Sequence, residues 1–222
     1  MQQPGESQAL YRHRFEEERL PARRRIWRTL CRHFFQRYVG AQDVVLDVGA
    51  GYCEFLNAIE CGERIAVDQN PDVERFAAEG TRIVLASSTA FGEVDDESVD
   101  VVFASNFFEH LPDTRSFLDT LKEIRRVLCP GGRLLILQPN IAATKERYWD
   151  FLDHHLPLTE RTVVEALQLC NYQVREVRAR FLPYTTKSRL PQHPFFIWVY
   201  LKVPIAHRVL GGQAWVVAEK PR

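Results

Sequence analysis

The stretch "VVLDVGAGYCEFL", Val44 to Leu56, is the feature that most constrains the fold of this chain. An apolar run leads directly into a glycine-containing turn, and the residues after the turn favour a helix. Gly49 and Gly51 allow a tight turn in which the backbone approaches a ligand closely. This order of strand, glycine turn and helix is typical of nucleotide-binding α/β proteins.

The same alternation continues along the chain. Further apolar strands are expected at 64–68, 82–86, 99–105 and 132–139, with helices at 54–60, after Pro71 and at 113–128. A helix at 160–170 and strands at 172–182 and 213–220 follow, separated by an irregular Pro-rich segment. Continuous apolar strands between helices indicate a parallel sheet that is covered on both faces. We therefore expect an α/β, doubly wound, Rossmann-like fold with a seven-stranded, mostly parallel sheet and an antiparallel C-terminal strand.

The remaining segments are expected to belong to the same single domain, residues 1–222. Residues 12–39 are rich in arginine and carry apolar residues at helical spacing, which predicts one or two amphipathic helices within an N-terminal cap, 1–42. Its "ARRR" run favours a solvated helix face over a phosphate site. Residues 43–140, which contain the glycine turn, would form the cofactor-binding core. Residues 141–222 would form the C-terminal part, including the acceptor side, where the second substrate would bind.

Composition narrows the class of function. Lys plus Arg and Asp plus Glu are 29 each, so no global field favours nucleic acid, and a polynucleotide substrate is not expected. The five scattered cysteines include no CxxC pair, which argues against a disulfide framework and a zinc site. The first residues lack a signal pattern, and the run "FFIWVYL" is too short to span a bilayer, so we expect a cytoplasmic protein.

The glycine loop also favours one class of cofactor. A dinucleotide site would place a third glycine at position 54, where this chain has Glu54, and a carboxylate repels a pyrophosphate. S-adenosyl-L-methionine carries a sulfonium and an ammonium instead, which suit acidic neighbours such as Asp47. Asp68 ends the second expected strand, 21 residues after Asp47, where a carboxylate accepts both ribose hydroxyls. The loop therefore favours S-adenosyl-L-methionine over NAD.

The block "VLDVGAGYCEFL … AVDQNPD … SVDVVFASNFFEHL … LKEIRRVLCPGGRLLILQPN" resembles the class I S-adenosylmethionine-dependent methyltransferases, in particular the broad group that includes the ubiquinone and menaquinone biosynthesis methyltransferases. The resemblance covers roughly residues 43–140 and implies S-adenosyl-L-methionine as cofactor. It implies a cofactor site made of Asp47, Gly49, Ala50, Gly51, Asp68, Gln69, Ser87, Ser88 and Asn106. Many relatives place an Asp where this chain has Ser88, and Cys53 replaces the usual third glycine of the family's loop.

The acceptor is expected beyond the carboxyl ends of the strands, under the segment that follows residue 138. Methyl transfer to a hydroxyl benefits from a base, and histidine suits that role near neutral pH. His154 and His155 are the favoured candidates, with Asp153 as an orienting group, and His110 is the rival. A capping or packing role accounts equally well for His154 and for His155, and the alternative for His110 is to order the loop before Pro112. A metal site drawn from Asp153, His154, His155 and Glu109 is not expected, because adjacent histidines point in different directions.

Residues 183–211 form an unusually long connection. Ordinary covering of the sheet edge is favoured; a lid, a homodimer contact or a patch on a membrane surface stay open. Tyr184, Lys187 and Arg189 are candidates for binding a polar acceptor. Together these features predict a methyltransferase for a small molecule, most simply a hydroxyl of a sugar, glycan precursor or secondary metabolite. The pattern leaves open N- or C-methylation, a nicotinamide-dependent oxidoreductase and a non-catalytic binding module.

Overall fold

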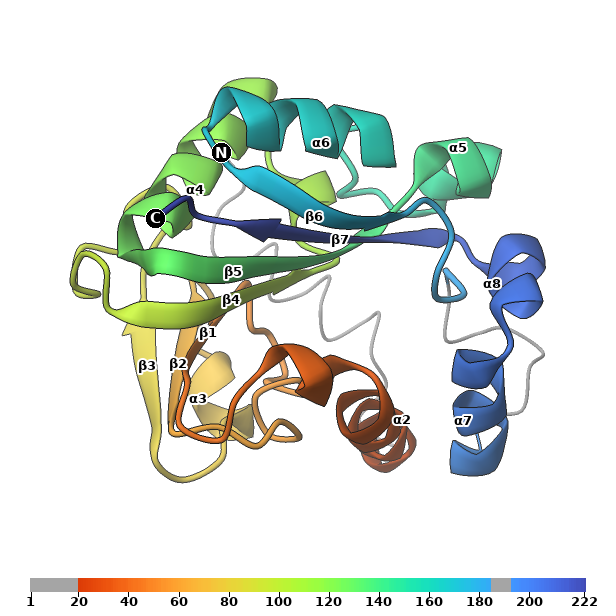
Figure 1. Ribbon diagram of the computed structural model, residues 1–222, viewed down its shortest axis with the longest axis horizontal. Helices are drawn as coiled ribbons and strands as arrows, with labels where there is room; N and C mark the ends of the chain where they lie inside the picture. Colours follow the sequence, from red (N-terminus) through yellow and green to blue (C-terminus); the bar gives the residue numbers. More distant parts are fainter. Residues whose placement is uncertain (1–19, 185–192) are drawn as a thin grey trace.

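The computed structural model describes residues 20–184 and 193–222, which form one seven-stranded sheet with helices on both faces (Figure 1). The strands are β1 (Val44–Val48), β2 (Glu63–Asp68), β3 (Thr81–Leu85), β4 (Val99–Ser105), β5 (Leu128–Pro139), β6 (Gln173–Arg178) and β7 (Gln213–Glu219). The α-helices are α2 (Leu20–His33), α3 (Val73–Phe76), α4 (Thr114–Val127), α5 (Ile141–Thr144), α6 (Glu160–Leu169), α7 (Pro194–Lys202) and α8 (Pro204–Leu210). Short 3₁₀ turns are η2 (Phe35–Tyr38), η3 (Phe108–His110) and η4 (Lys145–Asp150).

The strand order is β3-β2-β1-β4-β5-β7-β6, with β1 to β5 parallel. β7 runs antiparallel to both β5 and β6 and so inserts between them. This topology confirms the doubly wound, mostly parallel sheet with an antiparallel C-terminal strand. It also reverses the direction of winding at β1 and β4, where a ligand crevice forms in folds of this kind.

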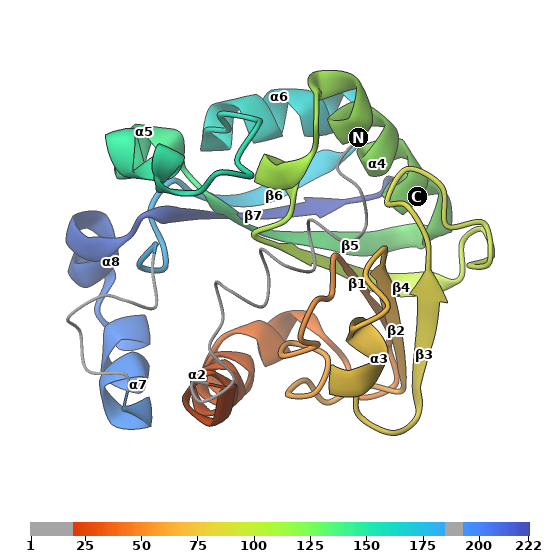
Figure 2. The ribbon, with the colours of Figure 1, turned by 180° about the vertical axis from the view of Figure 1, so that it is seen from behind.

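Two hydrophobic cores lie on opposite faces of the sheet. Figure 2 shows α4 and α6 over one face and α2 over the other. α4 and α6 cover one face with aliphatic side chains such as Leu121 and Leu167. α2 and η2 cover the other face with aromatic rings, and Phe55 stacks on Phe103 of β4 at 3.8 Å between centroids. Aromatic side chains bury large areas, so this second core fixes α2 against β1 and β4.

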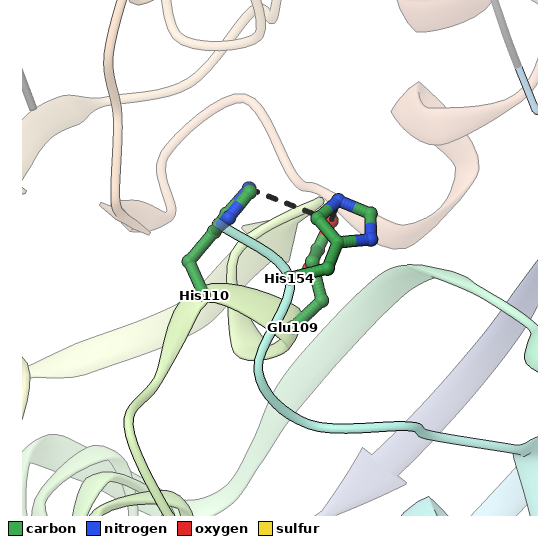
Figure 3. A group of neighbouring side chains, drawn as sticks. All are labelled: Glu109, His110 and His154. Carbon is green, nitrogen blue, oxygen red and sulfur yellow. Dashed lines mark ion pairs between the residues drawn. The ribbon is translucent and has the colours of Figure 1, made fainter. Parts of the chain in front are cut away.

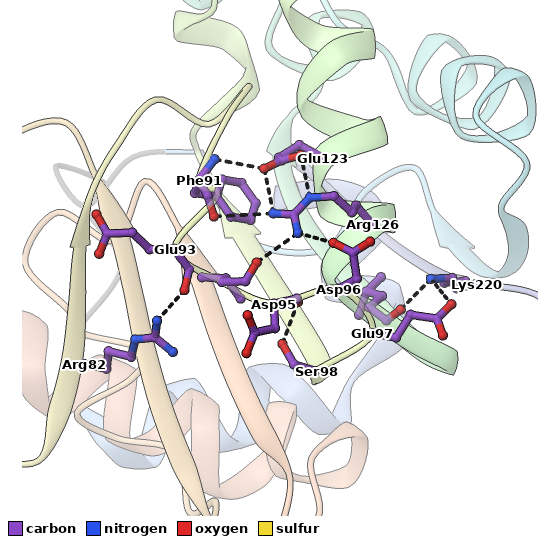
Figure 4. A network of polar contacts seen from close by, with 12 residues as sticks. Arg82, Phe91, Glu93, Asp95, Asp96, Glu97, Ser98, Glu123, Arg126 and Lys220 are labelled. Atoms are coloured by element: carbon purple, nitrogen blue, oxygen red, sulfur yellow. Dashed lines mark hydrogen bonds and ion pairs between the residues drawn. The ribbon is translucent and has the colours of Figure 1, made fainter.

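Arg126 of α4 orders the loop between β3 and β4 (Figure 4). Its guanidinium donates to the carbonyl of Val94 at 2.9 Å, and it pairs with Asp96 at 2.5 Å and with Glu123 at 2.8 Å. Glu123 in turn accepts the backbone N–H of Phe91 at 2.9 Å. This loop begins with Ser87 and Ser88, two of the expected cofactor residues, so α4 holds that segment in place.

The segment after the glycine loop corrects one expectation. The sequence pattern predicts a helix at 54–60, whereas residues 51–59 form a series of turns. Cys53 has a φ of +52°, in the left-handed region, and its carbonyl accepts the N–H of Asn57 at 2.8 Å. The turns that follow, such as that closed by the N–H of Ile59 and the carbonyl of Phe55 at 3.0 Å, do not join into a continuous helix, while Phe55 and Leu56 remain buried.

The segment between β6 and β7 corrects a second expectation. The Pro-rich stretch is not irregular in its described part, because α7 and α8 occupy 194–210. Pro194 and Pro204 each stand in the first turn of a helix, where a missing N–H costs nothing. Lys187 and Arg189 lie outside the described residues, as do residues 12–19 of the expected N-terminal helices.

The left-handed conformation of Cys53 predicts that glycine is more stabilising than alanine at this position, the reverse of their order within a helix. Cys53→Gly should be more stable than Cys53→Ala by about 1 kcal/mol, because alanine keeps the steric penalty of the positive φ and glycine does not. Gln168, which is exposed within α6, supplies the control. There Gln168→Ala should have a higher free energy of unfolding than Gln168→Gly by about the same amount. Denaturant unfolding of the four variants measures both differences. Equal stability of the two Cys53 variants would contradict the expected strain.

Candidate functional site

The turn after β1 packs the glycine loop against β2 and against the segment that follows β4. The N–H of Gly49 donates to the carbonyl of Val67 in β2 at 2.8 Å. Gly49 has a φ of +71°, and a Cβ at this position would overlap the ring of Phe107, which follows β4. Glycine is therefore required here both by conformation and by space, and the loop touches the carboxyl end of β4.

Asp68, the last residue of β2, organises this loop. One carboxylate oxygen accepts the N–H of Gly51 at 2.8 Å, and the other accepts the N–H of Asn70 at 2.8 Å. Burial raises the pKa of the Asp68 carboxyl, and these two backbone hydrogen bonds lower it in part. Each oxygen retains further acceptor capacity, so this carboxylate could also bind hydroxyl groups of a ligand.

Three carboxyl groups gather at the loop. Asp47 lies in β1, Asp68 at the end of β2, and Glu54 beyond the glycines. Burial raises the pKa of Asp47 well above its usual range, and the charges of Asp68 and Glu54 add to this effect. Glu54 pairs with Arg23 of α2 at 2.5 Å, which lowers its pKa again after burial has raised it.

These features fit S-adenosyl-L-methionine. Buried carboxyl groups whose pKa values are raised by desolvation and mutual repulsion are stabilised by a positively charged ligand. The turns over 51–59 present no helix N-terminus of the kind that holds a pyrophosphate, which disfavours a dinucleotide. Glu54, however, has its own cation in Arg23, so Asp47 and Asp68 are the acids that would address the ligand.

The other expected cofactor residues lie around the same edge. The backbone N–H of Ala50 approaches the carbonyl of Val67 at 3.3 Å, and Gln69 is exposed beside Asp68. Asn106 follows β4 with a φ of +49° and donates from its amide to Ser105 at 2.9 Å. Both serines use their hydroxyls locally. Ser87 contacts Thr89 at 2.9 Å, and Ser88 is buried against Thr120 of α4 at 2.8 Å.

Glu109 is the centre of a second group, at the carboxyl end of β4 (Figure 3). Its side chain is 1% exposed, one oxygen accepts from the Gln138 amide at 3.0 Å, and burial raises its pKa. The other oxygen lies 3.7 Å from Nε2 of His110 and 4.0 Å from Nε2 of His154. Residues from two segments 44 positions apart in sequence thus converge on one buried carboxylate.

The two histidines differ in exposure and in partners. His110 is partly exposed, and its Nδ1 lies 2.9 Å from the carbonyl of Asp153 and 3.2 Å from the carboxylate of the same residue. A carbonyl only accepts, so Nδ1 carries the proton and Nε2 of neutral His110 keeps its lone pair. His154 is buried and its ring packs on Phe151 and Tyr148.

His155 does not join this group. Its side chain is exposed, while its backbone N–H donates to the carbonyl of Glu109 at 2.8 Å. The structure therefore pairs His154 with the more distant His110 and directs His155 elsewhere. Ligand-type atoms of Glu109, His110 and His154 all lie within 4.8 Å of one another, so these three residues could hold a cation, without Asp153 and His155.

Three contacts of the site are not expected from the sequence. Arg23 comes from an arginine run that gives no sign of which member points inward. Phe107 fills the space beside Gly49, and Gln138 supports Glu109 from β5. Only Gln138 has a usable signal, as a polar residue ending an apolar strand at the expected ligand edge.

Two comparisons relate part of this chain to methyltransferases. Residues 46–136 match the family model described as a methyltransferase domain. A malonyl-[acyl-carrier protein] O-methyltransferase of Coxiella burnetii is 33% identical over 113 residues, which are 50% of this chain and 39% of that protein. The chain thus matches well under half of the length of that curated relative.

Solved structures share the fold. A SAM-dependent methyltransferase from Archaeoglobus fulgidus has a TM-score of 0.65 at 22% identity, with 89% of this chain and 94% of that chain covered. A chain in a complex that contains the Haloferax volcanii Trm112 methyltransferase activator has a TM-score of 0.66 at 20% identity, with 89% and 91% covered. The family match and the shared fold agree, and residues 46–136 of this chain carry a class I S-adenosylmethionine-dependent methyltransferase domain.

Proposed function

We propose that the protein transfers the methyl group of S-adenosyl-L-methionine to an oxygen of a small-molecule acceptor. The favoured acceptor is a hydroxyl of a sugar, a glycan precursor or a secondary metabolite. One observation carries the proposal: the acidic glycine loop and the Glu109 group lie at the same edge of the sheet, joined by the contact between Gly49 and Phe107. A cationic methyl donor and a proton acceptor would thus be neighbours.

The chemistry follows from the partners of His110. Methyl transfer is an in-line displacement, in which the acceptor oxygen attacks the sulfonium methyl carbon and the thioether leaves with the bond's electron pair. Nε2 of His110 would take the proton of the attacking hydroxyl. The resulting imidazolium would be stabilised by Glu109 on one side and by Asp153 on the other.

His154 supports this arrangement as a positioning residue in the proposal. Its ring is buried between aromatic neighbours and lies 5.0 Å from the ring of His110. It also approaches the same oxygen of Glu109, so it keeps the carboxylate directed toward His110. His155, being exposed and outside the group, is not required for proton transfer.

A carboxyl acceptor is the second candidate, because the matched Coxiella burnetii relative is named for O-methylation of malonyl-[acyl-carrier protein]. A carboxylate is already a nucleophile and needs no base, so that reaction would leave His110 without a catalytic role. N- or C-methylation would use the same cofactor loop with a different attacking atom. A non-catalytic binding module would hold the cofactor and transfer nothing.

The proposal is tested in two steps. Calorimetry should detect binding of S-adenosyl-L-methionine and of its demethylated product, and absence of both would refute it. Labelled cofactor is then offered with sugars, phenolic metabolites and malonyl-[acyl-carrier protein] in parallel. Cofactor binding without transfer to any acceptor class would favour the binding module.

Asp68 should control cofactor affinity. Asp68→Ala removes a charged acceptor for hydroxyl groups, and each such hydrogen bond is worth roughly 1.5–3 kcal/mol. Affinity for S-adenosyl-L-methionine should fall at least about tenfold by calorimetry, since about 1.4 kcal/mol is tenfold. Asp95→Ala, at an exposed acid away from the loop, is the control. Unchanged affinity in Asp68→Ala would place the ribose elsewhere.

Ionisation of the buried Asp47 carboxyl should lower the stability of the folded protein at neutral pH. Its folded-state pKa lies above its unfolded value, so the stability held by the neutral form is complete below the unfolded pKa and is lost as pH rises through the folded pKa. Without cofactor, Asp47→Asn should raise Tm at pH 7, by about 2–4 °C per kcal/mol regained, and change it little near pH 3. The same variant should bind cofactor more weakly. Identical Tm values at pH 7 would contradict a costly buried charge.

The variants His110→Ala and His155→Ala should differ in their turnover rates. His110→Ala removes the proposed base and should lower turnover on a hydroxyl acceptor about 10²–10⁴-fold, with cofactor affinity unchanged. His155→Ala is the matched control and should keep near-native turnover. Steady-state rates with labelled cofactor measure both. Should His110→Ala retain its rate while His155→Ala loses it, the base is assigned to the wrong residue.

A further inference from the structure

Helices α7 and α8 expose an apolar face. Seven of the twelve large apolar side chains that are exposed in the described part of the chain lie between residues 195 and 210. They are 37% to 69% exposed and comprise Phe195, Phe196, Trp198, Val203, Ile205, Val209 and Leu210. Such a concentration of exposed apolar side chains marks an interaction surface.

The face is separate from the side of α7 that holds the helix on the protein. Ile197, Tyr200 and Leu201 pack against the aromatic core at helical spacing. Phe195, Trp198 and Lys202 follow one another at intervals of three and four residues and so form a different stripe of the same helix. α7 thus uses one side for packing and leaves its aromatic side unpacked, and no residue of α7 is fully buried.

The surroundings of this face are basic. The stretch 193–212 contains Lys202 and Arg208 and no Asp or Glu. α2 lies alongside α7 (Figures 1 and 2) and likewise contains no acid. Four of its arginines are exposed, namely Arg24, Arg25, Arg28 and Arg32. Because the whole chain has a net charge of zero, this concentration of positive charge is local.

We propose that α7, α8 and the exposed arginines of α2 form a surface that binds an anionic lipid bilayer. Aromatic and aliphatic side chains on short helices enter the headgroup region, and lysine and arginine near them meet the lipid phosphates. The protein would lie on the membrane, since no helix in the described residues is long and apolar enough to cross it. This inference does not rest on the proposed methyl transfer.

Charge decides between a bilayer and a second copy of this chain. A two-fold dimer brings the same surface of each copy together, which would set the arginines of α2 near those of the partner with no acid on α2 or α7 to pair them. An anionic bilayer pairs these charges directly. The basic rim therefore favours lipid as the occupant.

Sedimentation with vesicles tests the surface. The full chain should bind vesicles of phosphatidylcholine mixed with phosphatidylglycerol, bind phosphatidylcholine alone more weakly, and be released by salt. Trp198→Ser combined with Ile205→Ser should reduce partitioning at least about tenfold through lost apolar insertion. Arg24→Gln combined with Arg28→Gln should reduce it about tenfold or more on the anionic vesicles only.

Two exposed residues elsewhere provide matched controls. Leu169→Ser and Arg161→Gln, both at α6, change an exposed apolar and an exposed basic side chain on the opposite layer of the fold, and neither should alter vesicle binding. Circular dichroism and cofactor binding confirm that each variant is folded. The proposal is overturned if the native chain ignores anionic vesicles, or if the controls weaken binding as much as the test variants. It is equally overturned if gel filtration shows a dimer that the α7 and α8 substitutions dissociate.

Discussion

Parallel pairing of β1 with β2 and β4 is the constraint on which the site depends. Register places Asp47 opposite Ala66 on one side and Phe103 on the other, so the three strands end together. Each strand then delivers its polar residues to a common edge: the glycine loop, Asp68, and the Glu109 turn. Because the strands themselves are almost wholly buried, this edge is held rigidly by two cores.

The buried acids of the glycine loop destabilise the ligand-free fold and favour binding of a cationic ligand. Burial raises the pKa of Asp47, Asp68 and Glu54, and for Glu54 the ion pair with Arg23 offsets part of the rise. A folded chain without ligand therefore holds carboxyl groups whose ionisation is unfavourable, and a cationic ligand reverses that cost. The same acids that disfavour a pyrophosphate thus favour a sulfonium cofactor.

The sequence predicts those secondary-structure elements whose apolar pattern is repeated over many residues. The apolar strands at 43–48, 64–68, 82–86, 99–105 and 132–139 were located correctly, and their order follows from general rules of winding. The pattern is misleading at 54–60, where Phe55 and Leu56 are buried from separate turns and not from a helix, a difference that a helical composition does not reveal. The pattern is also misleading at α7 and α8, because the Pro-rich segment was expected to be irregular although both prolines occupy helix starts.

The histidines show a different limit. Adjacent positions such as His154 and His155 are grouped easily by sequence, yet the partner of His154 is His110, brought from the end of β4 by a shared contact with Glu109. Such a convergence depends on how the segment after β5 folds back. It does so through backbone bonds from His155 and Leu156 to the carbonyl of Glu109, which no periodicity encodes.

Helix α2 connects the two proposals. Arg23 reaches Glu54 beside the cofactor loop, while α2 also packs beside α7 and exposes its other four arginines. Tyr184, on the connection that leads from β6 toward α7, lies with its ring 5.7 Å from Phe151 in the segment that carries His154. The proposed bilayer surface and the cofactor loop thus share helix α2, and the connection after β6 packs against the segment that carries His154.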